Sequence, residues 1–207
     1  MLRALPIVLL FSLAACGSAT APDARNGHDG FAGDALRRYT TYSDQGNPWS
    51  LQPGALRGDG FGLHAVLVRN GAALRDGWVE VLADSVDDGG LVLRFADNEH
   101  YYLLAVRDDQ APAPRGQDNL QLYRRSGPGQ AGFTSLWRRN VAWPRGTQRE
   151  VRFEAAGDSL RVYLDGERMG AVADTARLTG SRLGLRHYGD SPDWTTRYRR
   201  LRWRVER

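Results

Sequence analysis

Arginine and aromatic side chains stand at positions where strand alternation points them away from a core. In the segment 90–95, apolar residues occupy every second position, so Leu91, Leu93 and Phe95 are expected to point inward and Arg94 outward. The later segment with the sequence RLGLRHY alternates in the same way, with Leu183, Leu185 and His187 inward. The residues expected to point outward there are Arg182, Arg186 and Tyr188.

The outward set has the chemistry of a sugar-binding surface. Aromatic rings can stack on sugar rings, and guanidinium groups donate hydrogen bonds to oxygen atoms. The predicted ligand-binding residues are Arg94, Tyr102, Arg186, Tyr188 and Trp194. A purely structural role stays open for each of them, because Trp and Tyr also fill sandwich cores and Arg stems cover exposed sheet faces.

No catalytic residue is predicted. A retaining glycosidase needs two carboxyl groups about 5–5.5 Å apart. The densest acidic run, Asp84, Asp87 and Asp88, contains no glutamate and continues into two glycines, which favours a turn. No serine stands in a Gly-x-Ser-x-Gly motif. The histidines stand alone in their segments and do not indicate a zinc site: His28, His64, His100 and His187.

The elements that must position these residues are β-strands. The segment 90–107 contains two apolar runs around Asp97, Asn98 and Glu99, the pattern of a β-hairpin. From residue 31 onward, short runs of strand formers alternate with Gly, Asp, Asn and Pro clusters, and no helical stripe is sustained. We therefore predict an all-β, two-sheet antiparallel sandwich, with a tight hairpin turn at Asp165-Gly166.

Composition favours one soluble domain. The chain has 207 residues, of which 42% are hydrophobic and 25% charged. The formal charge is +4, and all 28 basic residues are arginines spread over nearly every strand-like segment. Because they do not cluster on one element, no nucleic-acid partner is predicted.

The N-terminal residues predict where the protein is located. One positive charge precedes an apolar run and small residues, the layout of a secretory signal over residues 1–15. The ending Leu-Ala-Ala-Cys resembles the lipobox of bacterial lipoproteins, which implies cleavage before Cys16 and lipidation of its sulfur. Residues 16–29 are expected to be the lipidated cysteine and a flexible tether, followed by the domain at 30–207. The alternative is an ordinary signal peptide with a chance cysteine.

The order of motifs resembles a known family. The sequence runs through GLVLRF, YYL, LYR, LRVYLDG and GSRLGLR, beginning at residues 90, 101, 122, 160 and 180. This order is similar to the concanavalin A-like lectin and glucanase jelly roll, in its laminin-G-like branch, over residues 31–205. The resemblance implies a two-sheet jelly roll whose members include glycan-binding modules and glycoside hydrolases.

The resemblance also sets limits on chemistry. The Glu-x-Asp-x-x-Glu spacing of the family-sixteen hydrolases does not occur here. Related jelly rolls often hold a structural calcium ion, with oxygen ligands at the rim of the sandwich. Apart from this possible calcium no cofactor is expected, and the weak candidate ligands are Asp97, Asn98, Asp118 and Asn119.

These observations predict a non-catalytic module that binds polysaccharide or cell-envelope glycan. The lipid anchor would hold it in the bacterial cell envelope, at the outer membrane, facing the periplasm or the exterior. The alternatives are a glycoside hydrolase related to the 3-keto-disaccharide hydrolases and a purely structural or protein-interaction lipoprotein.

Overall fold

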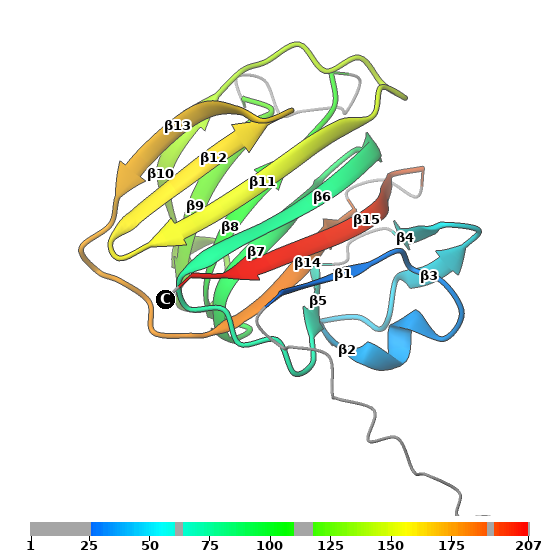
Figure 1. Cartoon of the computed structure of the whole chain (residues 1–207), viewed down its shortest axis with the longest axis horizontal. Helices are drawn as coiled ribbons and strands as arrows, with labels where there is room; N and C mark the ends of the chain where they lie inside the picture. The colour runs from blue at the N-terminus through cyan, green and yellow to red at the C-terminus, as the bar shows by residue number, and fades with distance from the viewer. Residues whose placement is uncertain (1–25, 61–63, 110–117, 190–192, 207) are drawn as a thin grey trace, which may run out of the picture.

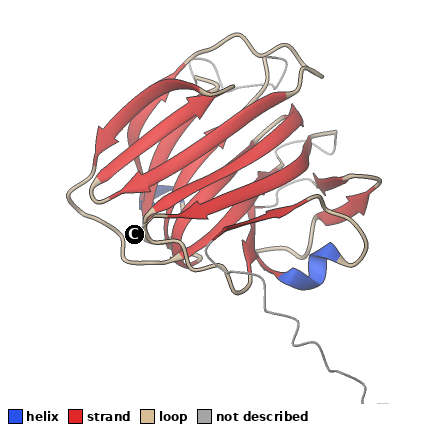
Figure 2. Cartoon of the chain, viewed as in Figure 1, coloured by secondary structure: helices blue, strands red, loops and turns tan. Residues whose placement is uncertain are grey.

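Two stacked antiparallel sheets make up the described part of the protein (Figures 1 and 2). The computed structural model describes residues 26–60, 64–109, 118–189 and 193–206. Sheet A has the order β13 (Glu167–Ala173), β12 (Ser159–Leu164), β11 (Arg149–Ala156), β6 (Gly77–Val86), β15 (Thr195–Val205), β4 (Ala55–Asp59), β3 (Trp49–Gln52), with β1 (Asn26–Asp29) also paired to β15. Sheet B has the order β10 (Phe133–Arg139), β9 (Leu120–Ser126), β8 (His100–Val106), β7 (Gly89–Asp97), β14 (Arg182–Tyr188), β5 (His64–Arg69), β2 (Tyr39–Ser43). The predicted all-β sandwich is confirmed.

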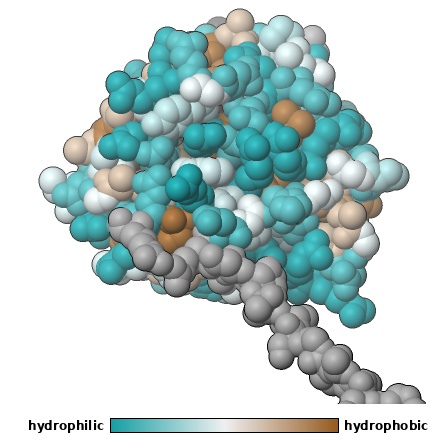
Figure 3. All heavy atoms as spheres, in the orientation of Figure 1, coloured by the Kyte–Doolittle hydropathy of each residue, from teal (hydrophilic) through white to brown (hydrophobic). Residues whose placement is uncertain are grey.

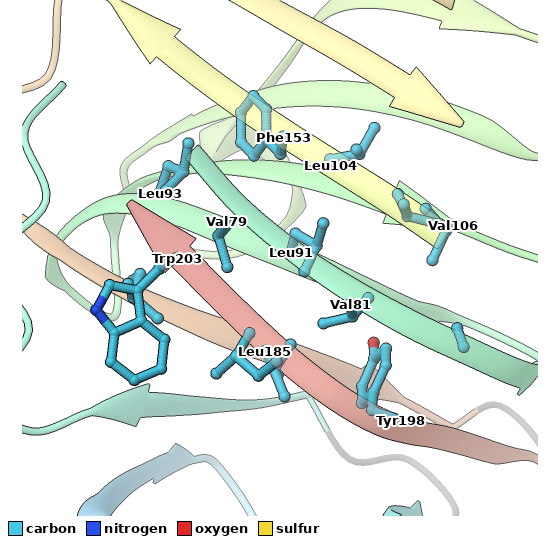
Figure 4. Packing of buried hydrophobic residues seen from close by; sticks show 14 of the residues in the cluster. Val79, Val81, Leu91, Leu93, Leu104, Val106, Phe153, Leu185, Tyr198 and Trp203 are labelled. Atoms are coloured by element: carbon cyan, nitrogen blue, oxygen red, sulfur yellow. The ribbon is translucent and has the colours of Figure 1, made fainter. Parts of the chain in front are cut away.

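The main core lies between the two sheets (Figure 4). Leu91 and Leu93 of β7 meet Val79 and Val81 of β6 there, and Phe153 of β11 belongs to the same cluster. Burying each such side chain contributes about 1.5–3 kcal/mol relative to exposure. The inward direction predicted for Leu91 and Leu93 is therefore confirmed.

Turn chemistry sets most strand boundaries. Asp165 and Gly166 have φ values of 50° and 82°, as a type I′ hairpin turn requires, and they join β12 to β13. Pro53 and Gly54 separate β3 from β4, since proline lacks the N–H that a ladder needs. Two short 3-10 helices, η1 (Ala35–Arg38) and η2 (Gln130–Gly132), precede β2 and β10.

The folded region begins before the predicted domain boundary at residue 30. Residues 26–29, expected as the end of the tether, form β1 and pair with β15. Asp29 is buried and accepts hydrogen bonds from Arg38 and Tyr39, which ties this strand to the domain. Cys16 and the predicted signal segment lie outside the described residues.

A bulge in β7 changes the direction of Arg94. Val92 and Phe95 pair with Gly184 and Arg182 of β14, so β7 has one more residue than its partner between these points. Arg94 has a φ of 50° and is fully buried. Phe95 consequently lies on the outer face of sheet B, in a second apolar cluster. The predicted outward Arg94 and inward Phe95 are both wrong, because a period of two does not survive an inserted residue.

Arginine and acidic side chains cover the outer face of sheet A (Figure 3). Glu80 accepts hydrogen bonds from Arg152 and Arg202. Burial acts to raise the pKa of Glu80, but these hydrogen bonds hold it below its ordinary value. The guanidinium groups of this face are thus partly neutralised by acids. None of the described helices is both long and apolar enough to cross a membrane.

Buried His187 should make the stability depend on pH. Burial, with a smaller effect of the positive charge on Arg186, lowers its pKa to about 4. The unfolded chain, with a histidine pKa near ~6.5, then binds more protons than the folded chain between these values. The contribution of this group to stability is therefore complete above this pH window and is lost as the pH falls through it, by up to about 1.4 kcal/mol per pH unit.

Urea unfolding at pH 7 and pH 5 should show a smaller difference in the free energy of unfolding for His187→Gln than for wild type. Equal pH dependence in both proteins would contradict this assignment, and the exposed His100→Gln is the control.

Candidate functional site

A pocket of about 510 Å³ opens on the outer face of sheet B. Its walls come from β5, β8, β9, β10 and β14 and from the segments that flank them. The residues that line it are Asp44, His64, Asp88, Leu103, Ala105, Arg107, Tyr123, Arg125, Gly129, Gln130, Phe133, Arg186 and Tyr188.

The strand register explains the hollow. Gly90 of β7 pairs with Arg186 on one side and with Ala105 on the other. A Cβ on Gly90 would lie 2.6 Å from the carbonyl oxygen of Leu104, so glycine is required at this position. Two small residues in the middle of the sheet thus leave room between the larger side chains that form the walls.

Asp88 fixes two arginines at one end of the pocket. It lies between β6 and β7, is almost fully buried, and accepts hydrogen bonds from Arg107 and Arg186 through different oxygens. The Arg186 guanidinium carbon also lies 5.2 Å from the centre of the Tyr188 ring. Both oxygens of Asp88 are therefore occupied, and the guanidinium of Arg186 is held in one orientation.

Arg125 contacts several side chains at the other end of the pocket. Its Nη1 donates to the hydroxyl of Tyr101 at 3.0 Å, and that hydroxyl lies 3.1 Å from Nε2 of His64. The Arg125 guanidinium carbon is 5.0 Å from the centre of the Phe133 ring. Burial, followed by the charges of Arg186 and Arg125, lowers the pKa of His64 to about 3. His64 is accordingly neutral at physiological pH and adds no charge of its own.

Aromatic rings form the side wall beside Arg125. The rings of Tyr123 and Phe133 meet edge to face, with 5.9 Å between centroids. Both side chains are half-buried and both line the pocket. A partly exposed ring that is fixed by a neighbouring ring can stack on a ligand at little cost in side-chain entropy.

Two of the five predicted ligand-binding residues, Arg186 and Tyr188, line this pocket. The alternation predicted for β14 is confirmed, since Leu183 and Leu185 belong to the main core. Whether these residues bind a ligand stays a prediction.

The other three predicted residues lie elsewhere. Arg94 is buried at the bulge described above. Tyr102 points inward, where its hydroxyl donates to Asp174 at 2.9 Å, so its neighbour Tyr101 is the one on the outer face. Trp194 is buried, with 5% of its surface exposed, and is not among the pocket-lining residues. The predicted grouping of Arg94, Tyr102 and Trp194 with Arg186 is therefore wrong.

The sequence contained a signal for some of the missed residues. In β9, Gln121, Tyr123 and Arg125 alternate with Leu120 and Leu122, the same pattern that identified the outward side of β14. The contributions of Phe133 and Asp88 depend on long-range pairing and were not visible in the spacing.

Three of the four candidate calcium ligands have protein partners, whereas the side-chain oxygen of Asn98 is buried without one. Asp97 accepts from the backbone N–H of Glu99 and contacts His100, both within its own hairpin turn. Asp118 faces Arg138, and Asn119 bonds Val141. In the described ranges, no group of three or more His, Cys, Asp or Glu side chains is arranged to hold a metal ion. A structural calcium stays a prediction.

Comparison with known proteins identifies the fold. No protein-family model and no curated protein sequence matches the chain. Among solved structures, the carbohydrate binding module CBM66 from Bacillus subtilis is similar with a TM-score of 0.61 and 16% identity, over 81% of this chain and 92% of that one. A Bacillus licheniformis β-glucanase matches with a TM-score of 0.59 and 12% identity, over 88% and 98%. A Bacillus subtilis protein of unknown function with a galectin-like fold matches with 0.62 and 10%, over 87% and 96%. The fold is thus the jelly roll of concanavalin A-like lectins and glucanases.

Proposed function

We propose that this protein is a non-catalytic carbohydrate-binding protein, and that the glycan occupies the pocket on the outer face of sheet B. One observation carries the proposal: fixed arginines, an aromatic wall formed by Tyr123 and Phe133, and a hollow of about 510 Å³ occur together on one sheet face. The similarity to a carbohydrate binding module supports the proposal through the shared fold.

The pocket carboxylates favour binding over hydrolysis. Asp44 and Asp88 are the acids that line the pocket. Acid-assisted cleavage needs one carboxyl group that donates a proton and a second that attacks or activates water. Both oxygens of Asp88 are already bonded to arginines, so this residue is better suited to positioning guanidinium groups. Release of reducing sugar by the purified domain would decide for a hydrolase.

Substitution of the aromatic wall tests the proposal. Phe133→Ala should weaken binding to a polysaccharide retained by the wild-type domain at least about tenfold, since it removes a stacking surface. Affinity electrophoresis through gels containing different polysaccharides measures the effect. Arg204→Ala, an exposed change on sheet A, should leave retardation unchanged. If no polysaccharide retards the wild type, the proposal fails, and a protein-interaction role would follow if an envelope protein is captured instead.

We also propose that Cys16 is lipidated and anchors the domain in the bacterial cell envelope, with the pocket available to envelope or exterior glycan. Metabolic labelling with an alkyne fatty acid should mark the wild-type chain and leave Cys16→Ser unlabelled. Equal labelling of both chains, or of neither, would contradict the anchor.

A further inference from the structure

We infer that the glycan bound in this pocket is acidic, and that its carboxylate or sulfate groups are held by Arg186 and by Arg125. This inference rests on the proposed function and adds the chemical class of the ligand.

The side chains that line the pocket offer more hydrogen-bond donors than free acceptors, which favours an acidic ligand. A neutral sugar presents hydroxyl groups, which both donate and accept hydrogen bonds, whereas a guanidinium group only donates. Arg107, Arg125 and Arg186 line the pocket, and Asp88 already receives a hydrogen bond on each oxygen from two of them, Arg107 and Arg186. The other lining carboxylate, Asp44, is exposed. A ligand group that only accepts hydrogen bonds complements this lining better than hydroxyl groups do.

Arg186 has donors left over. Its Nη1 bonds Asp88, but Nε is buried without an acceptor, and Nη2 has none among the described residues. A buried donor without a partner costs about 1–3 kcal/mol. Because Nε has almost no accessible surface, Nη2 is the donor of Arg186 that a carboxylate in the pocket can reach through a charge-assisted hydrogen bond. The arginine is 8% exposed, so its position is set by the fold rather than by solvent.

Arg125 offers a second donor at the other end. It is 6% exposed; Nη1 is bound to Tyr101 and lies near His64, and Nε makes a long contact of 3.4 Å with the carbonyl oxygen of Gly127. Nη2 has no hydrogen-bond partner in the described ranges. Burial is the main cause of the low pKa of His64, and the charges of Arg186 and Arg125 add to it.

A matched pair of probes, an acidic trisaccharide and its methyl ester, tests this inference together with a sulfated third probe. Isothermal titration calorimetry is run with a trigalacturonate, with the same trisaccharide methyl-esterified on its carboxyl groups, and with a sulfated trisaccharide. We expect the wild-type domain to bind the acid at least about tenfold more tightly than the ester, a difference of about 1.4 kcal/mol. Tight binding of the sulfated probe instead would assign the anion as sulfate. Affinity for the acidic probe should fall as salt is added.

Variants locate the effect. Arg186→Lys keeps a positive charge beside Asp88 but lacks the planar guanidinium that can donate to Asp88 and to a ligand in fixed directions, so affinity for the acid should fall about tenfold without unfolding. Arg125→Gln should also weaken the acid more than the ester, whereas Arg204→Ala should change neither. Equal binding of acid and ester would overturn the inference and leave the proposed function standing. If a folded wild-type domain binds neither these probes nor any neutral polysaccharide, both fail.

Discussion

Replacing Arg94 with alanine is expected to lower the free energy of unfolding by about 3–5 kcal/mol, because it removes the hydrogen bonds of a fully buried charged group and leaves a cavity. Its guanidinium donates to Asp76 at 2.8 Å and to the backbone carbonyls of Arg75 and Gly157. These bonds hold the approach to β6 against the turn between β11 and β12. Removing the side chain would break these three bonds and leave a cavity beside Tyr102, while Asp76 would keep the hydrogen bond from the backbone N–H of Gly157.

Urea unfolding followed by tryptophan fluorescence measures this loss. Arg94→Met keeps most of the volume and should recover part of the stability, which separates the cavity from the lost hydrogen bonds. Arg204→Ala should stay within about 0.5 kcal/mol of wild type, as is usual for exposed positions. A loss below about 1 kcal/mol for Arg94→Ala would contradict the structural role given to this arginine.

Replacing Asp88 with asparagine should have the second largest effect, because it acts on both stability and binding. The change removes the negative charge that lies between Arg107 and Arg186, which are themselves largely buried. Leaving buried charge uncompensated costs about 3–5 kcal/mol for a fully buried pair, and somewhat less is expected here. Arg186 would also lose its fixed orientation, so affinity for the ligand should fall.

Thermal unfolding and calorimetric titration of Asp88→Asn test the two effects together. Asp59→Asn is the matched control, since its ion pair with Arg57 is more than one-third exposed on both sides and is worth at most about 1 kcal/mol. If Asp88→Asn kept wild-type stability and affinity, Asp88 would not be the residue that positions the pocket arginines.

The fold was predictable because its signals are local. The Asp165-Gly166 turn and the alternation in β14 each depend on neighbouring residues, and each has a direct geometric consequence. The resemblance of the motif order to the concanavalin A-like jelly roll supplied the pairing of distant strands, which alternation alone does not provide.

The site was predictable only in part, because it depends on register. One inserted residue in β7 turned Arg94 inward, and adjacent Tyr101 and Tyr102 exchange roles if the face of β8 is misjudged by one position. The approach of Phe133 to Arg125 requires β9 and β10 to pair in one register, which short-range spacing does not set.

The ligand is expected to occupy the pocket on the outer face of sheet B. Titration of isotopically labelled protein with trigalacturonate, followed by backbone amide and arginine Nε–H resonances, tests it most directly. We predict that the largest shifts occur at Arg186, Arg125, Tyr123 and Phe133, with little change across β6, β11 and β15. Shifts confined to sheet A would contradict the account.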